Sequence, residues 1–129
     1  MRDEDYGRYV RINLPHARTI VQRIARTLDA LGGFGQESNG GAQALSEALA
    51  DVDGALRPFD ADPPAEEAIE AADAVAAKGR LLVDVIVAST CRSDRLGQHV
   101  RNFFECLGLN EEGADLALKC GERANSPLR

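Results

Sequence analysis

The chain of 129 residues contains few aromatic residues, with no Trp, two Tyr and four Phe. Sheet proteins draw heavily on aromatic and β-branched side chains, so this scarcity disfavours a β-sandwich or a barrel. Alanine and leucine are frequent instead, and both residues favour helices. The composition therefore predicts an all-α protein.

A long apolar run and a pair of closely spaced cysteines are also missing. The longest apolar run, residues 81–88, is interrupted by Asp84 and falls short of the roughly 18 residues that a membrane-spanning helix needs. The N-terminus is charged and lacks the apolar core of a signal peptide. Free thiols in a reducing cytoplasm are the simplest explanation for three cysteines without a C-x-x-C motif, Cys91, Cys106 and Cys120. We therefore expect a cytoplasmic protein with no membrane contact.

Five segments carry apolar residues at helical spacing, which predicts one domain, residues 1–129, built as a bundle of about five amphipathic helices. Pro15 and Pro63 stand where first-turn prolines are expected, and Asp62 is the expected N-cap of the third helix. Glycine or proline follows the first, second and fourth helices as a stop signal. The expected helices cover residues 15–31, 42–57, 63–89, 94–107 and 110–123.

The segments outside these helices are expected to be extended or flexible. Apolar and polar residues alternate over residues 9–14, which predicts a short extended N-terminal arm. Residues 1–8 and 125–129 are expected to be flexible ends. Residues 32–41 hold five glycines and predict a flexible loop between the first two helices.

An α+β fold is the alternative, because the third helix contains Gly79 and then a β-branched run. If the chain breaks at Gly79, residues 81–88 form a buried strand that pairs with residues 9–14. We favour the continuous helix, since an isolated two-stranded element is marginally stable in water.

The net charge of −6 is concentrated in the middle of the chain. Residues 41–77 hold one basic and nine acidic residues, for a net charge of −8, whereas residues 1–40 and 78–129 carry +1 each. Eight of these acidic residues are expected on the outward faces of regular helices or in the turn between them. They are Glu47, Asp51, Asp60, Asp62, Glu66, Glu67, Glu70 and Asp73.

An acidic surface repels nucleic acid and attracts a basic protein surface. No cluster of residues has the pattern of a catalytic or cofactor site. We therefore expect a small non-enzymatic protein that needs no cofactor and acts by binding another protein. It would be a regulator, inhibitor or assembly factor of the immunity, antitoxin or anti-defence type found in bacteria and phages, with the eight acidic residues as its docking face.

A helical enzyme or metal-dependent protein is a second hypothesis. Asp84 interrupts an apolar run, and a buried carboxylate acts as a general base when its pKa is raised, here with His99 as its partner. Zinc ligand types are also present, but their spacings of 8, 7 and 14 residues match no standard motif. The weak metal-ligand candidates are Cys91, His99, Cys106 and Cys120.

A DNA-binding regulator is a third hypothesis. Residues 103–123 have the order helix, glycine-containing turn, helix, which is the connectivity of a helix-turn-helix motif. The second of these helices begins Asn110-Glu111-Glu112, and acidic residues there repel phosphates.

Self-association is a fourth hypothesis. Ala42, Leu45, Leu49, Val52 and Leu56 recur at spacings of three and four residues, which is the pattern of a coiled-coil seam. Such a seam, if exposed, would build a homodimer.

Overall fold

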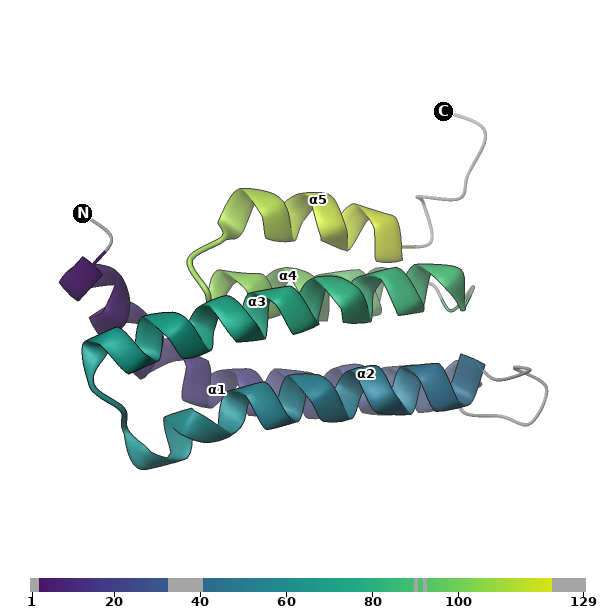
Figure 1. Ribbon diagram of the computed structural model, residues 1–129. Coiled ribbons are helices and arrows are strands. Elements are labelled where there is room, and N and C mark those ends of the chain that lie inside the picture. Colours follow the sequence, from purple (N-terminus) through teal and green to yellow (C-terminus); the bar gives the residue numbers. More distant parts are fainter. Residues whose placement is uncertain (1–2, 33–40, 90, 92, 122–129) are drawn as a thin grey trace.

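The computed structural model describes residues 3–32, 41–89, 91 and 93–121 (Figure 1). These residues form α-helices and one short 3₁₀-helix, with no strand among them, so the predicted all-α bundle of five helices is confirmed. None of the described helices is long and apolar enough to cross a membrane. The elements are α1 (Asp3–Ala30), α2 (Gly41–Leu56), η2 (Arg57–Ala61), α3 (Ala65–Ala88), α4 (Asp94–Glu105) and α5 (Asn110–Cys120).

The predicted extended arm over residues 9–14 is wrong, because α1 already begins at Asp3 and includes Pro15 in its interior. Val10 and Leu14 are fully buried and Ile12 is 63% exposed, so the alternation marks the inner and outer sides of a helix. Of residues 1–8, which were expected to be a flexible end, those from Asp3 onward belong to α1.

Two tyrosines fix the first turns of α1 against the end of α4. The Tyr6 hydroxyl donates a hydrogen bond of 2.8 Å to the Leu107 carbonyl, and the Tyr9 hydroxyl donates one to the Glu105 carbonyl. These anchors offset the intrahelical hydrogen bond that Pro15 removes.

Residues 81–88 are helical, so the alternative with a two-stranded element is wrong. α3 runs through Gly79 without a break. A Cβ atom at Gly79 would lie 2.7 Å from Cε2 of Phe103, so the glycine allows an aromatic ring of α4 to pack directly on the α3 backbone. The feature that suggested a chain break is a helix contact.

The end of α4 agrees with the predicted glycine stop, whereas the start of α3 differs from the predicted N-cap. The Ser93 hydroxyl accepts a hydrogen bond of 3.0 Å from the Leu96 amide, and Gly108 has the left-handed φ of +73° expected after α4. Pro64, not Asp62, is the N-cap residue of α3. Asp62 instead closes η2 with a φ of +50°, and its carboxylate bonds to Arg11.

Most of the predicted flexible loop and the predicted C-terminal end lie outside the described residues. Of residues 32–41, the structure describes Gly32, in a turn with a φ of +83°, and Gly41, which begins α2. Residues 125–129 are not described.

The helices share one apolar core to which each of them contributes. Figure 1 shows α2 and α3 in the nearer layer, α1 and α4 behind them, and α5 beside α4. α1 contacts α2, α3 and α4. Leu45, Val52 and Leu56, the main residues of the predicted seam in α2, are at most 1% exposed within this core. The seam is therefore occupied inside the monomer, which removes it as a surface for a homodimer.

Candidate functional site

All eight acidic side chains expected on the docking face are exposed. They come from α2, η2, the turn after η2, and α3. Their neighbours divide them into a set that is paired within the fold and a set that lines open surface.

The acidic side chains around η2 are paired with arginines of α1. Arg18 Nη1 lies 2.9 Å from Asp60 Oδ1, and Arg18 Nε lies 3.5 Å from Asp53 Oδ1. Arg11 contacts Asp62 Oδ1 through both Nη2, at 3.1 Å, and Nε, at 3.3 Å. Asp60 and Asp62 therefore help to hold η2 against α1, and their charges are largely balanced there.

A shallow groove of about 290 Å³ runs between α2 and α3, and we call it the acidic groove. Three carboxylates and one lysine lie along it. Leu81, 54% exposed, supplies an apolar side chain among these charges. Its lining residues are Ala44, Glu47, Ala48, Asp51, Lys78, Leu81, Asp84 and Val85.

Asp84 belongs to the acidic groove and is not buried. The expectation of a desolvated carboxylate is therefore wrong, since the side chain lies on the outer side of α3. Glu47 and Asp51 of α2 line the same groove, whereas His99 lines a different one. The structure does not bring Asp84 and His99 together as an acid and base pair.

The acidic surface continues over the first turns of α3. Glu67 and Glu70 line a second hollow of about 600 Å³, together with Pro58, Pro63 and Pro64. Glu66 and Asp73 are exposed on the same part of α3. We call Glu66, Glu67, Glu70 and Asp73 the α3 acidic extension.

A groove of the opposite charge lies between α1 and α4, and we call it the basic groove. It measures about 340 Å³ and is lined by Arg23, Arg26 and Thr27 of α1 and by Arg95 and His99 of α4. Burial, and secondly the charges of Arg23 and Arg95, lower the pKa of His99. This groove was missed in the sequence because its arginines lie on two helices that are far apart along the chain.

The four weak metal candidates are dispersed. Cys106 lies beyond the C-terminal end of α4, close to Tyr9, whereas Cys120 lies at the other end of the α4–α5 pair, where its carbonyl accepts a hydrogen bond from the Ser93 amide. Within the described part of the chain, no three His, Cys, Asp or Glu side chains are grouped so as to hold a metal ion. Burial, and secondly Glu105, raise the pKa of the Cys106 thiol, which leaves less of the reactive thiolate.

The predicted helix-turn-helix segment is an antiparallel hairpin. A Cβ atom at Gly97 would meet the Ala117 carbonyl, and one at Gly113 would meet Phe104, so α4 and α5 are in close contact along their length. In a helix-turn-helix motif the two helices cross at roughly 90–120°. Two exposed residues near the start of α5, Glu111 and Asp115, are acidic.

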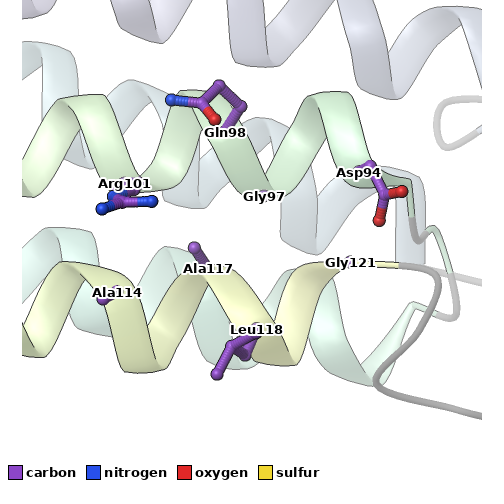
Figure 2. Close-up of a pocket in the computed structure, with 8 residues that line it drawn as sticks. All are labelled: Asp94, Gly97, Gln98, Arg101, Ala114, Ala117, Leu118 and Gly121. Atoms are coloured by element: carbon purple, nitrogen blue, oxygen red, sulfur yellow. The ribbon is translucent and has the colours of Figure 1, made fainter.

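A cavity of about 400 Å³ lies along one side of this hairpin (Figure 2). Figure 2 shows Ala117 pointing towards α4, while Gln98 and Leu118 point away from the space between the two helices. The only charged side chains in its lining are Asp94 and Arg101. The cavity thus has little of the charge that distinguishes the other two grooves.

Comparison with known proteins gives no match among protein-family models, curated proteins or solved structures. The fold places the chain in the class of all-α helical bundles. Its distinguishing surface features are two shallow grooves of opposite charge, one between α2 and α3 and one between α1 and α4.

Proposed function

We propose that this is a non-enzymatic binding protein, a regulator, inhibitor or assembly factor, that docks a basic segment of another protein in the acidic groove. The observation that carries the proposal is the position of Leu81. This half-exposed leucine lies in a groove with Glu47, Asp51 and Asp84. An apolar centre with a charged rim is the arrangement of a protein interface.

Part of the charge of this surface is not used in ion pairs within the described residues, although Glu47 accepts a hydrogen bond from Gln43. Within the described residues, no arginine or lysine nitrogen lies within 4.0 Å of a carboxylate oxygen of Asp51, Asp84 or Glu70. By contrast, Asp60 and Asp62 have arginine partners on α1. Unpaired surface charge accelerates association with an oppositely charged partner and orients it.

The shape of the surface around the acidic groove fits a helical or extended segment of a partner. Short side chains contribute to this surface, since Ala44 and Ala48 line the groove and Ala50, Ala74 and Ala77 are exposed on the same two helices. A partner helix is able to lie close to such a surface and place an apolar side chain on Leu81. We propose that its flanking lysines or arginines face the acidic groove and the α3 acidic extension.

A double charge reversal tests this docking surface. The test variant carries Asp51→Lys and Asp84→Lys, and the matched control carries Glu111→Lys and Asp115→Lys on α5, where both side chains are also exposed. The partner is captured from a lysate of the source organism, purified, and titrated against each variant at several salt concentrations. We expect the groove variant to lose at least about tenfold in affinity, a difference of about 1.4 kcal/mol, and the control to bind like the wild type.

The proposal also predicts how affinity responds to salt and to a substitution at Leu81. Affinity for the wild type should fall as salt rises, because exposed charges are screened. Leu81→Ser should weaken binding without changing the slope against salt. Equal affinity of the groove variant and the α5 control, or a partner whose binding does not respond to salt, would contradict the proposal.

We also propose that the protein works in a reducing compartment such as the cytoplasm. Cys91, Cys106 and Cys120 are all free thiols, and Cys120 is fully buried. Free cysteines of this kind are typical of reducing compartments.

A further inference from the structure

The basic groove brings three arginines together with little to balance them. Arg23 and Arg26 lie in the last turns of α1, and Arg95 lies in the first turn of α4. No carboxylate of the described residues lies within 4.0 Å of their side-chain nitrogens. Two other arginines of α1, Arg11 and Arg18, each form an ion pair with an aspartate.

From this convergence we infer that the basic groove binds a small molecule carrying a phosphate group. Guanidinium groups donate paired N–H bonds that match phosphate oxygens, and several arginines together match a dianion or a higher charge. The volume of about 340 Å³ lies at the lower end of the range for small-molecule sites. A groove of this size between two helices suits a phosphorylated small molecule better than the broad surface of a macromolecule.

His99 is the second part of the site. Its Nδ1 atom is buried and has no hydrogen-bond partner among the described residues. The charged groups facing it are Arg23 and Arg26 from α1 and Arg95 from α4, all of them positive. A bound phosphate would oppose their field and favour protonated His99, which then donates N–H bonds to the anion or its surroundings.

The two histidines provide an internal comparison for the test. The chain has only His16 and His99, and His16 is exposed on α1 outside the basic groove. Inorganic pyrophosphate is titrated into the full-length protein at constant ionic strength, and the pKa of each histidine is followed by NMR. We expect saturable binding that raises the pKa of His99 by about one unit, with His16 unchanged.

Matched variants separate a site from general charge attraction. Arg26→Gln with Arg95→Gln should weaken pyrophosphate binding at least about tenfold. Arg8→Gln with Arg57→Gln removes the same charge from exposed positions outside the groove and should leave binding unchanged. All four positions are exposed, and circular dichroism checks that each variant remains folded.

Three results would overturn the inference. The first is an equal shift of His16 and His99, which indicates screening and not a site. The second is equal weakening by both double variants. The third is a response of His99 to duplex DNA but not to pyrophosphate at the same phosphate concentration, which identifies nucleic acid as the ligand.

A response to adenosine monophosphate as well as to pyrophosphate supports a phosphate ester as the natural ligand. None of these measurements depends on the acidic groove.

Discussion

The two helical hairpins, α2–α3 and α4–α5, place some of their glycines in opposite environments, packed in α4–α5 and open in α2. In α4–α5, Gly97 and Gly113 are buried, and each leaves no room for a Cβ atom, because Ala117 O and Phe104 Cβ would lie only 2.7 Å away. In α2–α3, Gly54 has nothing within 4 Å of such a Cβ atom, and Ala77 is exposed. Gly97 and Gly113 therefore set the distance between α4 and α5, whereas Gly54 and Ala77 leave a low, open surface on the outer side of α2 and α3.

This difference separates a close helix contact from an exposed surface, and the proposed docking site belongs to the surface. The surface beside α2 and α3 carries the acidic groove with Leu81, and substitutions there have little packing to lose. The α4–α5 contact includes fully buried Phe104, and there is no room for a Cβ atom at Gly97 or Gly113. The following substitutions test whether the two hairpins differ in this way.

Among these substitutions, the largest loss of stability is expected when an apolar side chain of α4 is removed. Phe104 is 1% exposed and packs edge to face on Phe103, with 5.3 Å between ring centroids. Phe104→Ala should lower the free energy of unfolding by about 3–5 kcal/mol. Leu81→Ala, at a half-exposed position in the acidic groove, should change it by less than about 1 kcal/mol. Urea unfolding followed by circular dichroism measures both, and similar losses would contradict the description of Leu81 as part of an open surface.

The same glycine-to-alanine change should have opposite signs in the two hairpins. Gly97→Ala forces a Cβ atom against a backbone carbonyl of α5 and should destabilise the protein by about 1–3 kcal/mol. Gly54→Ala, in open space on α2, should stabilise it by about 0.5–1 kcal/mol, because alanine loses less backbone entropy. Thermal unfolding of the two variants beside the wild type checks the signs. A destabilised Gly54→Ala variant would contradict the open-surface description of α2.

Local sequence signals predicted much of this fold but failed where contacts between distant segments determine a helix boundary. Ser93, Gly108 and Pro58 act on neighbouring residues, and the corresponding helix ends are close to those expected. Pro15 was misleading, because a proline suits the first turn of a helix and here lies inside one. What extends α1 to Asp3 is the burial of Val10 and the bonds of its tyrosines to the end of α4, which no local pattern reveals.

The surface features required knowledge of which helices are neighbours. Asp84 joins Glu47 and Asp51 only because α3 packs beside α2. Asp60 and Asp51 have the same chemistry in the sequence, yet only Asp60 is paired with Arg18. The basic groove draws on residues of α1 and α4 that are separated by more than half of the chain. The net charge of a segment therefore predicted an acidic surface but not its division into paired and open parts.

The smallest expected effect is at the ion pair that joins the two hairpins, Arg80 of α3 with Glu112 of α5. Both guanidinium contacts are short, with Nε 2.6 Å from Oε2 and Nη2 2.9 Å from Oε1. The hydrogen bond from Arg80, and secondly its charge, lower the pKa of Glu112. A carboxyl whose folded-state pKa is lowered stabilises the protein above its unfolded pKa, and this contribution is lost as pH falls through the folded value.

Glu112→Gln should therefore cost stability at neutral pH and little in acid. Both side chains are about a third to a half exposed, so solvent screening limits the loss to about 1 kcal/mol or less. The difference in unfolding free energy between wild type and variant should shrink as pH falls below the ordinary glutamate pKa of about 4.3. Urea titrations at a series of pH values follow that difference, with Glu111→Gln, exposed on the same turn of α5, as the control. A difference that stays constant with pH would mean that Glu112 contributes through packing, and that the two hairpins are joined by apolar contacts alone.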